Sequence, residues 1–149
     1  MTENTHNSSS DTFTPYTVDV ELWQLKFFAK AVGETNPIYY DEEAAKSAGY
    51  RSIMAPPTYA VTLSSAVPDP FVRPRAMGMD LTKLLHTRQR FDYFEPIFGR
   101  DRITFAPKIV DAYEKARGRF RFMVEETLVT NQFGVRVALL KQTLVEQRT

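Results

Sequence analysis

The sequence predicts one α+β domain, because helical patterns fill its first half and strand patterns fill its second half. Apolar residues recur at helical spacing up to about residue 67, whereas from about residue 86 they alternate with polar or charged residues. Helices that precede a run of strands are typical of an antiparallel sheet with helices on one side. The 149 residues suffice for one such domain, which we expect over residues 15–149, after a disordered polar tail over residues 1–14.

The first helix is expected over residues 18–32. Asp19 or Thr17 can cap its start, and Gly33 can end it because glycine accepts the left-handed conformation. Its apolar residues fall on one face at helical spacing, as in an amphipathic helix that packs on a core: Val20, Trp23, Phe27, Phe28 and Ala31.

Two more helices are expected before the strands. A short one starts at Asp41 and ends at Gly49. Another begins near Pro57, because proline is tolerated in the first helical turn, and ends near Val67, before Pro68. Most residues of this last helix are small, so a sheet could wrap closely around it.

Strands are expected where apolar and polar residues alternate. Such alternation occurs near residues 91–93 and 103–105, over Gly118–Thr130 and over Val135–Val145, with a turn at Asn131–Gly134 between the last two. Long segments of this kind joined by short turns predict an antiparallel meander.

The composition excludes several classes of function. A net charge of +1 gives no electrostatic reason to expect binding to nucleic acid or membrane. No apolar stretch approaches the roughly 20 residues of a membrane span, and no secretory signal is recognisable, so we expect a cytoplasmic protein. The absence of cysteine excludes thiolate catalysis, and two histidines are too few for a multi-histidine metal site, so no metal is expected.

Two segments carry a family resemblance. Residues 36–59 read NPIYYDEEAAKSAGYRSIMAPPTY, and residues 77–97 read MGMDLTKLLHTRQRFDYFEPI. They resemble the N-terminal dehydratase domain of MaoC-like proteins, a branch in which A-P-P-T and G-M-D-L-x-x-L-L-H are typical. The resemblance extends over about residues 15–147. It implies the hotdog fold, a curved antiparallel sheet wrapped around a central helix, and an enoyl-CoA hydratase or 3-hydroxyacyl-thioester dehydratase activity, a lyase of lipid metabolism.

The residues that would perform this chemistry are changed. In the family, G-D-x-N-P-(I/L)-H and a following A-H-G supply an Asp and a His that activate one water, and a glycine N–H that stabilises the enolate oxygen. Here Asn36 and Pro37 match, but Glu34 replaces the aspartate, Tyr39 the histidine and Pro57 the glycine. A phenol titrates near about 10 rather than about 6.5, and proline has no N–H. We infer that the standard active site is absent.

The resemblance therefore implies one half of a two-chain enzyme. In such enzymes one hotdog half holds the Asp/His pair, and the other half completes the double hotdog and shapes the acyl tunnel. The expected partners are an acyl-CoA or acyl carrier protein thioester and a catalytic MaoC-like chain, or a second copy in a homodimer. No cofactor is expected, since coenzyme A is only the substrate carrier.

Other functions remain open at this point. The chain could be a self-sufficient hydratase with Glu34 as its base, helped by Tyr39 or His86. It could also be a thioesterase or an acyl-CoA-binding module of the same fold.

Candidate substrate contacts lie in both segments. They are Asn36, Tyr39, Pro57 and Tyr59 in the first, and Arg88 and Arg90, which could bind the phosphates of coenzyme A, in the second. Simpler interpretations stand beside these. Asn36 can fix its own turn by bonding to the backbone, the arginines can face solvent or pair with Asp92 or Glu95, and His86 can bond to the backbone.

Overall fold

Within residues 13–148, five antiparallel strands form one long, curved sheet. The computed structural model describes residues 13–148, and residues 1–12 of the predicted tail lie outside them. The strands are ordered β1-β3-β4-β5-β2 across the sheet, so that β1 and β2 are its edges. Their bounds are β1 Tyr16–Asp19, β2 Leu84–Tyr93, β3 Arg102–Lys115, β4 Phe120–Thr130 and β5 Arg136–Gln147.

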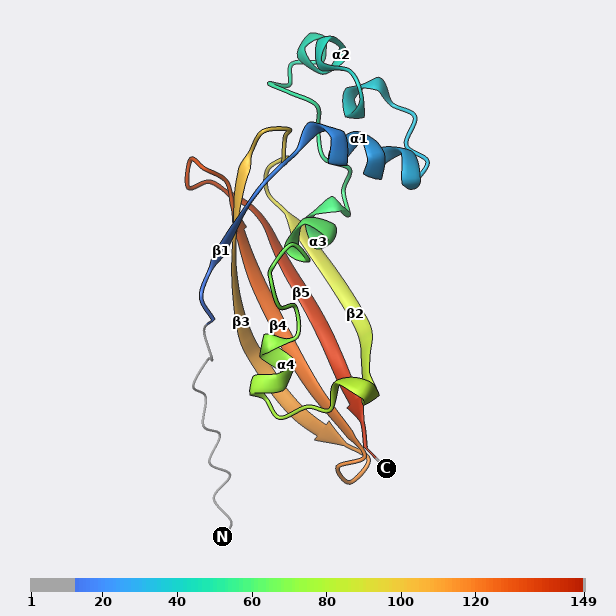
Figure 1. Cartoon of the computed structure of the whole chain (residues 1–149), viewed down its shortest axis with the longest axis vertical. Coiled ribbons are helices and arrows are strands. Elements are labelled where there is room, and N and C mark those ends of the chain that lie inside the picture. Colours follow the sequence, from blue (N-terminus) through green and yellow to red (C-terminus); the bar gives the residue numbers. More distant parts are fainter. Residues whose placement is uncertain (1–12, 149) are drawn as a thin grey trace.

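The helices all lie toward one side and one end of this sheet. Figure 1 shows α3 and α4 in front of the strands, while α1 and α2 gather beyond one end. Their bounds are α1 Leu22–Ala31, α2 Glu42–Ser47, α3 Tyr59–Ser64 and α4 Val72–Ala76, with 3-10 turns at Pro37–Tyr39 and Leu81–Lys83. No helix among residues 13–148 is long and apolar enough to cross a membrane.

The sheet closes around α3, which confirms the predicted α+β architecture with a central helix. Tyr59, Ala60 and Leu63 of α3 are at most 3% exposed. They belong to one core cluster with buried residues of β3, β4 and β5, including Phe105, Val129, Val137 and Leu140. The small residues of α3 permit this close enclosure.

The predicted helix boundaries are partly confirmed. Asp41 caps α2 by accepting a hydrogen bond from the Ala44 amide at 2.8 Å, and Gly49 follows in the left-handed region at φ 90°. The central helix is shorter than predicted, because the hydroxyls of Ser64 and Ser65 both bond to the Val61 carbonyl and compete with the helical backbone.

The predicted start of the first helix is wrong. Tyr16–Asp19 form strand β1, whose exposure alternates residue by residue and which pairs with β3. The Thr17 and Thr104 hydroxyls share a hydrogen bond of 2.9 Å across this pair. The helix itself begins at Leu22, so neither Thr17 nor Asp19 caps it. Gly33 ends it as predicted, at φ 75°.

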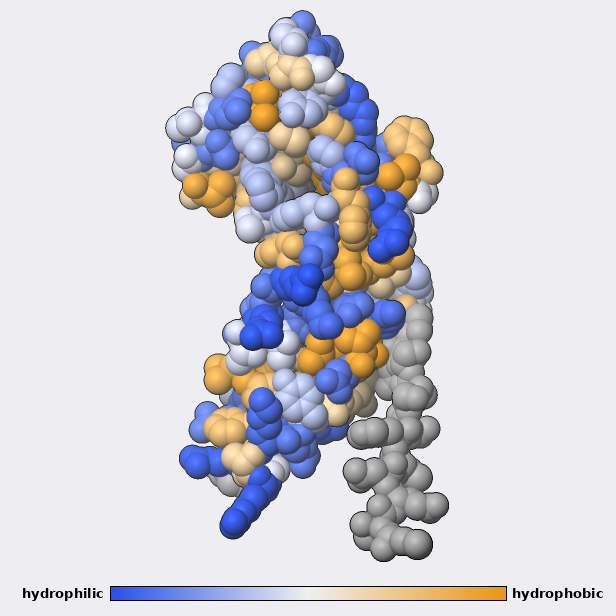
Figure 2. All heavy atoms as spheres, turned by 180° about the vertical axis from the view of Figure 1, so that it is seen from behind, coloured by the Kyte–Doolittle hydropathy of each residue, from blue (hydrophilic) through white to orange (hydrophobic). Residues whose placement is uncertain are grey.

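The predicted buried face of α1 is also corrected. Trp23 and Phe27 are 65% and 69% exposed, whereas Leu25 and Ala29 are completely buried. Apolar residues occur nearly all round α1, so helical spacing could not distinguish the two faces. The outer face of the sheet is likewise mixed, with apolar patches between charged residues when seen from behind (Figure 2).

Candidate functional site

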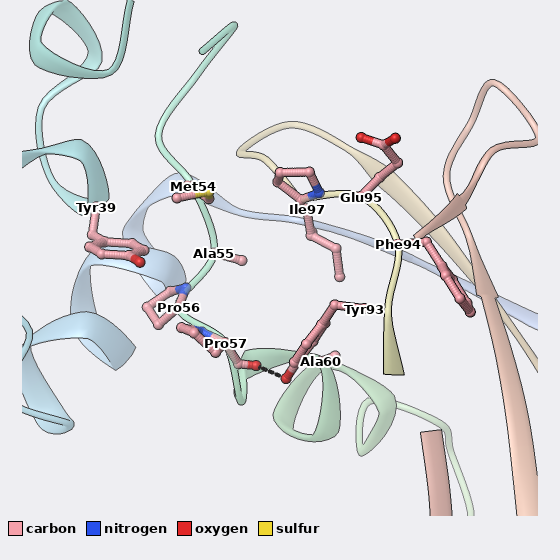
Figure 3. A pocket seen from close by; sticks show the side chains of 11 residues that line it. Tyr39, Met54, Ala55, Pro56, Pro57, Ala60, Tyr93, Phe94, Glu95 and Ile97 are labelled. Carbon is pink, nitrogen blue, oxygen red and sulfur yellow. Dashed lines mark hydrogen bonds between the residues drawn. The ribbon is translucent and has the colours of Figure 1, made fainter. Parts of the chain in front are cut away.

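Residues of the signature segment, which spans residues 33–59, line a cavity beside the central helix. It has a volume of about 250 Å³ and lies between the Pro56–Pro57 turn and the loop that follows β2. Tyr39, Pro56 and Pro57 line one side, and Tyr93 and Ile97 line the other (Figure 3). The wall is mainly apolar and also carries two phenols, whereas the carboxylate of Glu95 points away from the cavity (Figure 3).

Local hydrogen bonds hold these residues in place. The Asn36 side chain accepts from the Ile38 amide at 3.1 Å and starts the 3-10 turn that carries Tyr39, as the simpler interpretation of Asn36 predicts. The Ala55 amide donates to the Ile97 carbonyl at 2.8 Å, which fixes the segment before the two prolines. The Tyr93 hydroxyl donates to the Pro57 carbonyl.

The chemistry available in this first cavity differs from that of a water-activating pair. Burial raises the pKa of Tyr39, with Glu34 and Tyr50 adding to the rise, and burial also raises the pKa of Tyr93. Both phenols are therefore neutral near pH 7 and act as hydrogen-bond donors or acceptors, not as bases. Pro57 offers a carbonyl oxygen and has no N–H with which to stabilise an oxyanion.

The proposed base Glu34 does not line this first cavity. Its carboxylate accepts from the Thr35 and Asn36 amides at 3.1 Å and 3.3 Å, and so closes the turn after α1. The Tyr40 hydroxyl donates to the Glu34 carbonyl at 2.6 Å.

His86 lines a second cavity, of about 400 Å³, on the sheet side of α3. It is exposed on the edge strand β2, and its imidazole makes no hydrogen bond to any residue of the described part of the chain. Glu34 lies near enough to Tyr39 for its charge to act on the phenol, but His86 lies at the other cavity, so the three residues do not form one site. A catalytic role for any of them stays a prediction.

The remaining predicted contacts lie away from both cavities. Tyr59 is buried in the core, where its hydroxyl donates to the Gln24 side chain at 3.2 Å. Arg90 is held by a forked pair with Asp92, with contacts of 3.0–3.1 Å, as the simpler interpretation predicts. Arg88 is exposed, and neither arginine is among the residues that line a cavity. Their roles in binding coenzyme A remain predictions.

Comparison with known proteins identifies the family. Residues 9–140 match the model of the FAS1-like dehydratase domain region. The chain belongs to the FAS1-like dehydratase family. A UPF0336 protein of Saccharopolyspora erythraea is 35% identical over 126 residues, which cover 85% of this chain and 80% of that protein.

Solved structures confirm the hotdog fold and the predicted resemblance to MaoC-like dehydratases. The HadBC (3R-hydroxyacyl-ACP dehydratase) complex of Mycobacterium tuberculosis contains a chain with 25% identity and a TM-score of 0.73, covering 90% of this chain and 92% of that one. The ChsH1-ChsH2 complex of the same organism gives 18% identity and a TM-score of 0.74, over 93% and 89% of the two chains.

Two residues of this FAS1-like dehydratase domain, Tyr93 and Glu125, were missed as site candidates. Tyr93 reads as an ordinary alternating strand residue, and nothing in the sequence shows that it reaches Pro57. Arg73 and Glu125 form a buried ion pair at the second cavity although 52 positions separate them. Only the fold brings such distant residues together, so spacing could not reveal the pair.

Proposed function

We propose that this chain is the non-catalytic half of a two-chain MaoC-like hydratase or dehydratase. It shapes the pocket for the acyl group of a thioester, and a partner chain supplies the residues that activate water. The substrate is an acyl-CoA or an acyl carrier protein thioester.

One observation carries this proposal. Two signature positions line the first cavity, and they carry Tyr39 and Pro57 where an imidazole and a backbone N–H are needed. The imidazole of His86 lies at the other cavity. Loss of a single oxyanion donor costs about 100- to 1,000-fold in rate, and here the base is lost as well.

The edge strand β2 supports pairing with another chain. It has 10 residues, against about 5–6 in a typical strand, and within residues 13–148 only β5 pairs with it. A long free edge is a template for another strand. The HadBC and ChsH1-ChsH2 structures are complexes of two named components, which is consistent with such pairing.

The test uses the purified chain, a co-encoded MaoC-like chain with an intact D-x-N-P-x-H motif, and the pair purified together. Hydration of crotonyl-CoA and of a longer enoyl-CoA is measured for each. We expect no turnover by this chain alone, and higher turnover with the longer substrate for the pair than for the partner alone. Rapid hydration by this chain alone would contradict the proposal and favour the self-sufficient alternative.

A further inference from the structure

The wall of the second cavity contains two charged side chains, which a pocket for a plain acyl chain does not require. Arg73 of α4 and Glu125 of β4 form an ion pair there, and their side chains are only 8% and 3% exposed. Charged groups buried to this degree are stable only when they are paired and hydrogen-bonded. The pair therefore fixes two charged groups at one place in the cavity wall.

Glu125 has its hydrogen-bonding capacity largely used. Its carboxylate accepts from the Arg73 Nε, from the Gln142 Nε2 at 3.0 Å and from the Thr127 hydroxyl at 3.4 Å. It is consequently neither a free base nor a free acceptor for a ligand.

Arg73, in contrast, retains unused donors. Among residues 13–148, its Nε is the only one of its nitrogens that makes a hydrogen bond. No fully buried side-chain nitrogen or oxygen in that part of the chain lacks a partner, so the two terminal nitrogens are not sealed in the protein. Since Arg73 lines the cavity, these donors are available to a ligand there.

Tyr16 adds an acceptor to the same cavity. Its hydroxyl donates to the Ser64 carbonyl at 2.7 Å, so its oxygen can still accept one bond. Burial raises its pKa to about 12, and the positive charge of Arg73 offsets part of that rise. The phenol is neutral near pH 7.

Much of the rest of the wall suits a hydrocarbon chain, beside the polar side chains of Ser64, His86 and Gln89. Its apolar side chains come from α3, the segment after it, β2 and β5, and include Val61, Val67, Phe71, Leu84, Leu140 and Leu144. A volume of about 400 Å³ lies within the roughly 300–1,000 Å³ of small-molecule sites.

We propose that this second cavity binds an acyl group carrying an uncharged oxygen, either a hydroxyl or a keto group, and selects it over a plain alkyl chain. The oxygen accepts from a terminal nitrogen of Arg73, and a ligand hydroxyl also donates to Tyr16. An alkyl chain would cover the Arg73 donors without replacing their hydrogen bonds to water, which is costly. A carboxylate is disfavoured because Glu125 already balances the charge of Arg73. This proposal rests on the proposed function.

The probes are N-acetylcysteamine thioesters of decanoic acid and of two hydroxydecanoic acids, one hydroxylated at the chain end and one in mid-chain. Calorimetry on the full chain gives their dissociation constants. We expect at least one hydroxylated probe to bind about tenfold more tightly than the plain probe, the effect of one additional hydrogen bond.

Two variants test whether the Arg73–Glu125 ion pair and Tyr16 cause this preference for a hydroxylated probe. The double variant R73M/E125L replaces the ion pair by apolar side chains of similar volume, and such replacements are tolerated or stabilising in other proteins. We expect it to bind the plain and hydroxylated probes equally, and Tyr16→Phe to weaken only the hydroxylated ones. Arg75→Met is the matched control, because Arg75 lies on α4 but pairs with Asp69 at the surface. It should keep the preference.

The possible outcomes distinguish an error about the selection of an oxygenated chain from an error about acyl binding itself. Equal binding of all probes to the unmodified chain, or a preference that survives in R73M/E125L, would overturn the selection of an oxygenated chain but leave an acyl pocket intact. Binding of no probe would overturn both this proposal and the acyl-binding role of the second cavity. The turnover test with the catalytic partner would still judge the two-chain enzyme separately.

Discussion

At the scale of single residues, the signature segment keeps the Asn36–Pro37 pair that fixes the backbone turn. It lacks the histidine and the glycine N–H that the chemistry of the family needs. Asn36 starts a turn through its side chain, as the sequence predicts, since an asparagine before proline has few other local roles. Pro57 accepts the Tyr93 hydroxyl bond, a contact that depends on the fold and could not be read from the sequence. The segment therefore identifies the family better than it identifies the site.

Glu34 provides a direct test at this scale. Glu34→Gln in the assembled two-chain enzyme should leave turnover within about twofold, because the carboxylate serves the turn after α1 and an amide oxygen can accept the same backbone bonds. Steady-state hydration rates measure this, with an Asp→Asn change in the partner's motif as the control that should abolish turnover. A loss of 100-fold or more for Glu34→Gln would assign the base to this chain.

The lowered pKa of the Glu146 carboxyl predicts that the free energy of unfolding depends on pH. The Asp80 amide at 2.8 Å, followed by Arg148 at 3.0 Å, holds the pKa of this buried carboxyl below its usual range. A lowered folded-state pKa contributes stability above the unfolded value of about 4.3, and that contribution is lost as the pH falls through the folded-state pKa. The excess stability of the unmodified chain over Glu146→Gln should therefore shrink as the pH falls below about 4.

Urea unfolding at pH 7 and at several acidic pH values measures this difference. Glu43→Gln is the control, since the Glu43 side chain is 85% exposed in a surface pair with Lys46 and should contribute little at any pH. A difference for Glu146→Gln that stays constant with pH would contradict the assignment.

At the scale of elements, the alternation of apolar and polar residues predicted the long strands, whereas helical spacing predicted the wrong buried face for α1. Two apolar stripes overlap on α1, one with Leu25 and Ala29 and the other with Trp23 and Phe27. Periodicity cannot rank two stripes of similar length, and only packing against the sheet decides between them. The short strand β1 was missed because four residues give too little alternation to recognise.

The two faces of α1 should differ in their effect on stability. Leu25→Ala should lower the free energy of unfolding by about 2–5 kcal/mol, because it leaves a cavity in the core. Trp23→Ser and Phe27→Ser should each change it by less than about 1 kcal/mol, since both side chains are mostly exposed. Denaturant unfolding of the three variants measures this, and an equal loss for Trp23→Ser would restore the predicted face.

At the scale of the whole molecule, the central helix and the order of helices before the long strands β2 to β5 could be predicted, whereas the early strand β1, the two cavities and the free edge could not. The second cavity joins residues far apart in the sequence, such as Tyr16 and Leu144, and the first joins Tyr39 to Ile97. The edge depends on the strand order, because β2 pairs with the distant β5 and not with β3, which follows it in sequence. A single sequence does not contain this order in any local pattern.

The free edge gives the last prediction. Leu85 is 55% exposed on β2, and Leu85→Lys should weaken association with the partner chain about tenfold, because lysine on an edge strand opposes strand pairing. Val110→Lys is the matched control, since Val110 is 37% exposed on β3, an inner strand between β1 and β4. It should leave association unchanged. Analytical ultracentrifugation of the mixed chains measures both. If Leu85→Lys associates as tightly as the unmodified chain, the partner does not pair along β2, and the acyl pocket must be completed through another surface.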